Sequence, residues 1–202
     1  MSGVLLWGLV GLGVAVLVVR RRSIAVGLVT AQALMLAGYA LDHATAGKDV
    51  LAAVALGARA IGLAVVFLVV VARTREPRPV RADVAPLVRG GAAVAFALVL
   101  TWLVPHIGLS SRNAEHAVLA LVAFGVVAAA TRRATLFQVI GIVLIENGIA
   151  VAALTLPGTS SLIELGLALD LTLIVFVAVV FHERIFAEFG AGDTAALRSL
   201  RD

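Results

Sequence analysis

The chain has 202 residues, of which 62% are hydrophobic and 14% are charged, and its mean hydropathy is +1.11. This composition excludes a soluble globular domain and indicates an integral membrane protein. The formal net charge of +4 comes from short arginine clusters that lack interleaved aromatic residues, so nucleic acid is not an expected partner. Because the chain has no cysteine, disulfides and any metal or iron–sulfur centre held by cysteine are excluded.

Seven apolar runs follow one another along the chain. They cover residues 4–19, 23–41, 50–72, 90–105, 114–130, 134–156 and 161–182. A helix needs about 20 apolar residues to cross the roughly 30 Å hydrocarbon core of a bilayer, and most of these runs approach that length. We therefore expect an all-α, polytopic membrane protein with about seven transmembrane helices. The first run reaches Arg20 without a small-residue cleavage pattern, which favours a retained span over a signal peptide.

Basic residues follow every second run and are scarce in the alternate loops. They are Arg20, Arg21, Arg22, Arg73, Arg75, Arg78, Arg81, Arg89, Arg132, Arg133 and Arg184, whereas the opposite loops hold only Lys48 and Arg112. Lysine and arginine accumulate in cytoplasmic loops. The pattern therefore predicts an N-terminus outside and a C-terminus in the cytoplasm, in the inner (plasma) membrane of the cell.

An Arg/Pro-rich segment, 73–89, is expected to be an exposed cytoplasmic linker. It divides a first three-helix unit (1–72) from a connector helix and the start of a second unit (90–130), a second membrane unit (131–186) and a cytoplasmic tail (187–202). A shift of 111 positions superposes the first three runs on the last three, which suggests a weak parallel repeat of 3+1+3 helices. The tail is expected to dock on a partner subunit or on lipid headgroups.

Charged residues inside the apolar runs are the main functional candidates. Glu146 and Asp170 lie near the middle of the sixth and seventh runs, where a carboxylate costs about 2.5–3.5 kcal/mol. Glu164 lies nearer the outer interface, where simple hydration is an equally good explanation. Arg59, in the third run, needs a counter-ion. Either it forms a packing pair with Asp170 or Glu146, or it is a cation beside a carboxylate that carries protons.

Three amides, Asn147, Gln138 and Gln32, would extend a polar path, although single amides in membranes are more often packing contacts. The glycines are interpreted as helix contact sites. The histidines, which fall at the ends of the runs, are interpreted as interfacial; they are His43, His106, His116 and His182. No metal-ligand spacing, phosphate-binding loop or nucleophile with a positioned histidine is present, so no catalytic, cofactor or metal site is expected.

The second half of the chain resembles the hydrogenase-4 component E family. The resemblance is carried by Gln138-Val139-Ile140-Gly141, Ile145-Glu146-Asn147-Gly148-Ile149, Glu164-Leu165-Gly166 ahead of Asp170, and the ending Leu197-Arg198-Ser199-Leu200-Arg201. Members of that family are membrane subunits of energy-converting nickel–iron hydrogenase and formate hydrogenlyase-like complexes. Their last three helices are similar to the K subunit of complex I and the C subunit of multisubunit cation/proton antiporters.

The resemblance implies a non-catalytic, non-redox subunit without a cofactor. It implies a role in proton or sodium translocation for Glu146, and then for Asp170 or Glu164. The implied partners are antiporter-like membrane subunits and cytoplasm-facing nickel–iron hydrogenase and iron–sulfur subunits. Family members carry a lysine where this chain has Arg59; because arginine is very hard to deprotonate, a fixed charge is expected there. The alternative is a self-contained transporter of a small cation or metabolite, against which the scarcity of interrupted spans argues.

Overall fold

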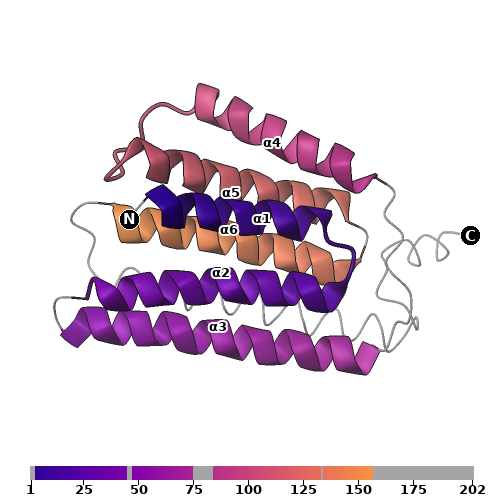
Figure 1. Ribbon diagram of the computed structural model, residues 1–202, viewed down its shortest axis with the longest axis horizontal. Helices are drawn as coiled ribbons and strands as arrows, with labels where there is room; N and C mark the ends of the chain where they lie inside the picture. Colours follow the sequence, from indigo (N-terminus) through magenta and orange to yellow (C-terminus); the bar gives the residue numbers. More distant parts are fainter. Residues whose placement is uncertain (1–2, 45–46, 75–83, 133, 157–202) are drawn as a thin grey trace, which may run out of the picture.

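The computed structural model describes residues 3–44, 47–74, 84–132 and 134–156. This part of the chain contains six helices and no strand: α1 (Gly3–Val18), α2 (Arg22–Asp42), α3 (Gly47–Thr74), α4 (Pro86–Leu103), α5 (Arg112–Thr131) and α6 (Thr135–Thr155) (Figure 1). The all-α prediction is confirmed for these residues. The seventh predicted run, 161–182, and the tail, 187–202, lie outside the described residues, so a total of seven spans stays a prediction.

Five of the six helices, α2 to α6, are long and apolar enough to cross a membrane. The remaining helix, α1, is also apolar, but it has only 16 residues and is therefore about 24 Å long. Length and composition thus suit a membrane-spanning protein. The orientation of the helices in a membrane stays a prediction.

The predicted bounds of the linker, residues 73 and 89, both differ from the structure. Helix α3 continues to Thr74, and α4 begins at Pro86, so Arg89 belongs to a helix and is not a loop residue. Proline is favoured in the first turn of a helix, because its fixed φ suits the helix and its missing N–H would have no partner there. The helix therefore begins four residues before the predicted start at Gly90.

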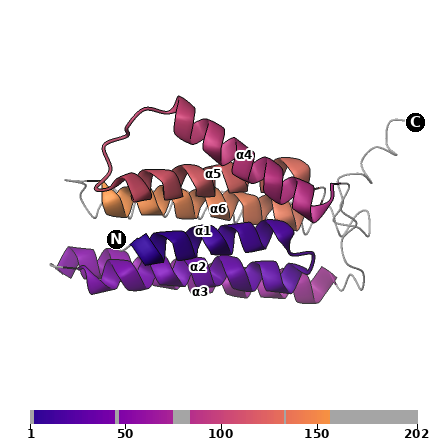
Figure 2. The same ribbon diagram turned by 45° about the horizontal axis from the view of Figure 1, so that its top comes forward.

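The helices lie side by side in one bundle (Figures 1 and 2). Helices α2 and α3 form one pair and α5 and α6 another, while α1 packs between α5 and α2. Helix α4 packs against α5 and α1 at the edge of the bundle, and it leans away from α5 toward its C-terminal end (Figure 2). Many buried apolar side chains come from α5 and α6, which therefore form the centre of the core.

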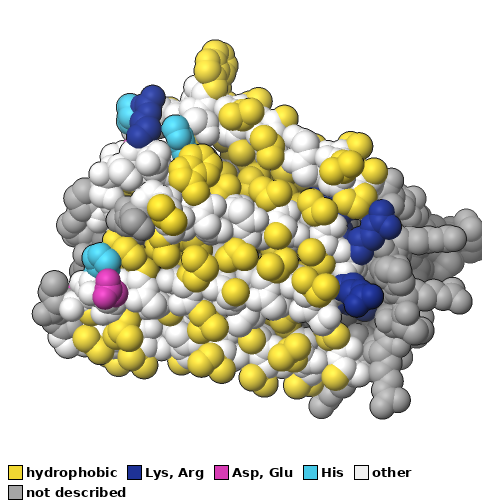
Figure 3. Space-filling model, viewed as in Figure 1, with side chains coloured by type: hydrophobic (Ala, Val, Ile, Leu, Met, Phe, Trp, Pro, Cys, Tyr) yellow, Lys and Arg dark blue, Asp and Glu magenta, His cyan; other side chains and the backbone are white. Residues whose placement is uncertain are grey.

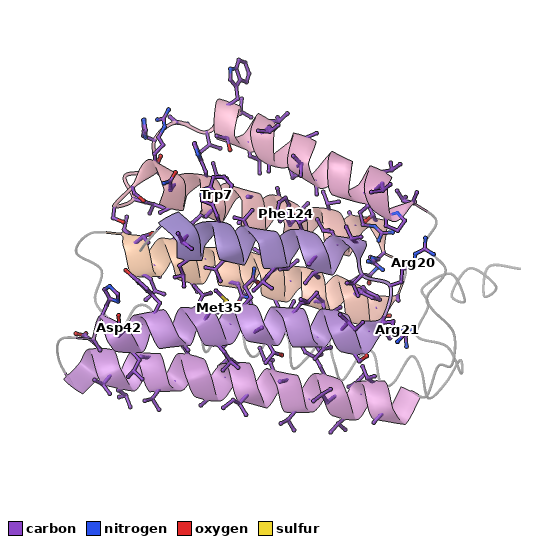
Figure 4. The ribbon with its side chains drawn as sticks, in the orientation of Figure 1. Trp7, Arg20, Arg21, Met35, Asp42 and Phe124 are labelled. Carbon is purple, nitrogen blue, oxygen red and sulfur yellow. The ribbon has the colours of Figure 1, made fainter. Side chains whose placement is uncertain are left out.

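The face of the bundle that Figure 3 shows is largely apolar between its two ends. Large hydrophobic side chains such as Trp7, Leu98 and Trp102 are more than half exposed. An apolar surface of this extent is unfavourable in water and suits contact with lipid. Arg20 and Arg21 lie at one end of the bundle and Asp42 at the other (Figure 4).

The orientation can be tested with two serines that lie at opposite ends of the bundle. Ser23 and Ser110 are both exposed, and the native chain has no cysteine that would react in their place. In intact cells, we expect a membrane-impermeant thiol reagent to label Ser110→Cys, and to label Ser23→Cys only after the membrane is permeabilised. The opposite pattern would show that the arginine end faces outward.

Glycines allow α5 and α6 to touch through their backbones. A Cβ atom added at Gly141 would lie 2.7 Å from the carbonyl oxygen of Gly125 and 2.8 Å from the nitrogen of Ala129. One added at Gly148 would lie 3.2 Å from the Cβ of Leu121. Small residues at helix contacts are typical of membrane proteins. The interpretation of glycines as contact sites is therefore confirmed here, whereas Gly27, Gly62 and several others have no described residue within contact distance.

We expect Gly141→Ala to destabilise the protein by about 1–3 kcal/mol, because the new methyl group would meet backbone atoms that no side-chain rotation can move. Gly27→Ala is the matched control. Alanine favours a helix over glycine by about 1 kcal/mol, and no atom of the described residues lies within 4 Å of a Cβ at this position. Thermal unfolding of the purified protein in detergent would measure both variants. Equal Tm values for the two would contradict a tight contact between α5 and α6.

The helix bounds agree with the suggested repeat. A shift of 111 positions carries α1 and α2 onto 114–129 and 133–153, within two residues of the bounds of α5 and α6. In space, α1 packs against α5 and α2 packs against α6. The first two helices of each predicted unit thus contact their counterparts. The repeat as a whole stays a prediction, since the counterpart of α3 lies outside the described residues.

Candidate functional site

An ion pair lies inside the bundle between α3 and α6. The Nη2 atom of Arg59 donates a hydrogen bond to Oε2 of Glu146. The side chain of Glu146 is 0% exposed and that of Arg59 is 10% exposed. The structure therefore pairs Arg59 with one of the two carboxylates that the sequence offered. The other, Asp170, lies outside the described residues, as does Glu164.

Both members of this pair are far from the helix ends. Glu146 lies near the middle of the 21-residue α6 and Arg59 near the middle of the 28-residue α3. Removing two charges from water is costly, and only good mutual geometry offsets that cost. The Oε1 atom of Glu146 and the Nε atom of Arg59 have no hydrogen-bond partner among the described residues. One carboxylate oxygen is therefore held by the arginine while the other remains able to accept a proton.

Two buried amides link three helices next to the ion pair. Asn147 Nδ2 donates to Gln32 Oε1 at 2.7 Å, and Gln32 Nε2 donates to the carbonyl oxygen of Leu9 at 2.7 Å. Both side chains are almost fully buried. Amides at neutral pH neither gain nor lose protons readily, and this sequence of bonds ends at a backbone carbonyl. Its effect is to hold α1, α2 and α6 together around Glu146.

Gln138 does not join these groups. It lies about two turns, or about 12 Å, before Glu146 on α6, and its Nε2 donates to the carbonyl oxygen of Arg132 at 2.9 Å. This residue lies in the first turn of α6, where it binds the backbone of the short connection from α5. Its predicted part in a polar path with Glu146 is therefore not supported by its position.

A small cavity lies beside the ion pair. It has a volume of about 10 Å³, and its lining combines the polar Arg59 and Asn147 with apolar side chains from α2, α3 and α6. This is close to the smallest volume that can hold one water molecule. The pair thus has room for about one water next to the arginine.

A second polar cluster lies at the end of the bundle away from Arg20. His106 Nδ1 is 2.9 Å from Oε2 of Glu115, and Arg112 donates to the ring of His106. The backbone N–H of Gly108, whose φ is +81°, donates to Oε1 of Glu115 at 3.2 Å. These bonds fix the connection between α4 and α5. Beside them is a cavity of about 290 Å³ whose lining includes Trp102, His106, Arg112, Glu115 and His116.

Sequence reasoning did not single out Glu115. The available signal was Ser111 followed by an acid in the first helical turn, a pattern that begins a helix. The structure confirms the cap, since Ser111 Oγ accepts a hydrogen bond from the N–H of Ala114. His43 is the C-cap of α2, His106 lies in the connection between α4 and α5, and His116 lies in the second turn of α5, so all three are near helix ends, as expected.

Two arginines that the sequence assigned to loops are buried. Arg89 is 0% exposed and Arg132 is 4% exposed. Arg132 donates to the carbonyl oxygens of Leu17 and Val19, at 2.9 and 2.6 Å. The last carbonyls of a helix have no partner within it and form the negative end of its dipole. Hydrogen bonds to the C-terminal end of α1 therefore stabilise these guanidinium groups in a buried position.

Comparison with known proteins identifies no family. No protein-family model matches the chain. An uncharacterized protein of Mycobacterium tuberculosis (strain H37Rv) is 36% identical over 91 residues, a match that covers 45% of this chain and 41% of the relative. No solved structure matches. Within the described residues, no group of three or more His, Asp and Glu side chains lies close enough together to hold a metal ion.

Proposed function

We propose that this chain is a non-redox membrane subunit of an energy-converting, hydrogenase-like assembly related to complex I. In this proposal Glu146 takes part in proton or sodium translocation that is coupled to electron transfer in partner subunits. The observation that carries the proposal is a fully buried carboxylate near the middle of α6 that is paired with an arginine on α3. The resemblance around Gln138 to Ile149 supplies the type of assembly.

The pair has the properties that a charge-changing site needs. Arginine keeps its proton, so only Glu146 can change its charge. A proton that arrives at the unpartnered Oε1 neutralises the carboxylate and weakens its attraction to Arg59. The arginine is then a buried cation without a full counter-charge, which favours release of the proton. Ion binding and release at Glu146 would thereby be coupled to the contact between α3 and α6.

The placement of the pair also suits a subunit with neighbours. Of the five candidate spans, α3 is the least buried within the described structure, and it carries Arg59. Only α3 therefore separates the ion pair from the outer surface of this part of the bundle. In the proposal an antiporter-like subunit packs alongside in the inner (plasma) membrane, while hydrogenase and iron–sulfur subunits bind on the cytoplasmic side.

Purification of a tagged full-length chain in mild detergent, followed by mass spectrometry, tests this assignment. We expect antiporter-like membrane subunits to co-purify together with nickel–iron and iron–sulfur subunits. A tagged membrane protein of similar abundance from the same cells is the control for non-specific recovery. A monodisperse chain that has no partners and transports a cation in liposomes would overturn the proposal in favour of a self-contained transporter.

A further inference from the structure

Two guanidinium groups lie next to each other at the arginine end of the bundle. Arg132 and Arg89 donate to the same carbonyl oxygen, that of Leu17, at 2.9 and 3.2 Å. Arg89 also donates to the carbonyl oxygen of Val84 at 2.9 Å. Burial and the positive charges of Arg89 and Arg20 lower the pKa of Arg132 to about 10. Two like charges are therefore held together in a poorly hydrated place.

No described carboxylate balances these charges. The acids in the described ranges are Asp42, Asp49, Glu115 and Glu146. The first three lie near helix ends away from Arg20, as Figure 4 shows for Asp42, and Glu146 pairs with Arg59. Most of the carbonyl oxygens that the two arginines bind lie at the C-terminal end of α1, where the helix dipole supplies about half a negative charge. This partial charge compensates only part of the cost of burying two full positive charges.

Some donors of the two arginines remain unused. Within the described structure, Arg89 Nε and Arg132 Nη1 are buried and have no hydrogen-bond partner. The ring of Phe137 covers one face of the Arg132 guanidinium, 4.0 Å from its centroid, so the group is held in a fixed orientation. Arg20 lies close enough to affect both buried arginines and is itself exposed. The cluster thus combines two fixed, buried cations with a third cation that is exposed.

We propose that Arg20, Arg89 and Arg132 form a binding site for the phosphate group of an anionic phospholipid. A phosphodiester offers a negative charge and several oxygen acceptors, which the buried N–H groups lack. Basic pockets between helices on the cytoplasmic side of a membrane bind such headgroups. Leu87 and Val88, beside Arg89 on α4, are 83% and 62% exposed, and they offer an apolar surface for the acyl chains. The proposal does not depend on the proposed function of Glu146.

Native mass spectrometry of the full-length chain, purified from its membrane in mild detergent, tests the site. We expect wild-type protein to retain a bound anionic phospholipid such as phosphatidylglycerol or cardiolipin, and to prefer it to added phosphatidylcholine. Each arginine near an anionic headgroup contributes about fivefold to affinity. The affinity for the anionic phospholipid, obtained from the bound fraction as the lipid is titrated, should therefore fall about fivefold in Arg132→Gln and by a similar or smaller factor in Arg20→Gln.

Arg20→Gln keeps the test valid if Arg132→Gln does not fold, because Arg20 is exposed and its side chain makes no hydrogen bond within the described residues. Arg112→Gln, at the opposite end, is the matched control and should retain lipid as the wild type does. Wild-type protein without bound phospholipid, or equal retention in Arg20→Gln and Arg112→Gln, would overturn the proposal. Release of the lipid by millimolar inorganic phosphate alone would assign the site to free phosphate instead.

Discussion

Replacing Arg59 with leucine is expected to destabilise the bundle by about 3–5 kcal/mol, because it leaves the carboxylate of Glu146 buried without a counter-charge. The double variant Arg59→Leu/Glu146→Leu should recover much of this loss. Apolar side chains of similar volume often replace a buried ion pair at little cost. Thermal unfolding of the purified variants in one detergent would measure both effects. Arg21→Leu, in which an exposed arginine is removed, is the matched control and should change stability by less than about 1 kcal/mol.

The pH dependence of the same variant provides a second test. In Arg59→Leu the cost comes from a negative charge on Glu146, and protonation removes that charge. The difference in stability between the wild type and the variant should therefore shrink as the pH falls. A difference that does not vary with pH would show that the loss comes from packing around residue 59 rather than from an unpaired carboxylate. Equal stability of the single and double variants would have the same meaning.

The sequence predicted the six described helices because the length of an apolar run in a membrane protein is set by the bilayer. It also placed Glu146 and Arg59 correctly near the middle of their helices. It could not choose between Glu146 and Asp170 as the partner of Arg59. The identity of the partner depends on the rotation of each helix about its axis. That rotation is determined by the packing of the helices against one another.

The arginines near the ends of the helices show a different limit. Arg89 and Arg132 followed the positive-inside pattern, and were therefore interpreted as loop residues. Their burial depends on the end of α1, whose free carbonyls lie between α4 and α5. The residues next to either arginine in the sequence do not indicate its contact with the distant Leu17. Likewise, Gln138 was grouped with Glu146 on composition alone, and only the start of α6 shows why it binds a carbonyl instead.

Glu146→Gln is expected to leave the assembly intact and to lower ion-coupled turnover of the proposed complex by about tenfold or more, as loss of a proton-transferring group typically does. Glutamine keeps the size of the side chain and can still accept a hydrogen bond from Arg59 through its carbonyl oxygen, but it cannot bind and release a proton. Turnover of the purified complex in proteoliposomes, measured together with ion movement, separates coupling from assembly.

Two further variants decide what a loss in Glu146→Gln means. Glu115→Gln removes a carboxylate from the cluster between α4 and α5 and should leave coupling unchanged, because that acid lies outside the proposed path. Glu146→Asp retains a group that can be protonated, although its carboxylate is about one bond farther from Arg59, so it should keep part of the activity. If glutamine and aspartate at position 146 reduce coupling equally, the side chain acts through its fit to Arg59. If the assembled Glu146→Gln complex couples as well as the wild type, Glu146 carries no ion.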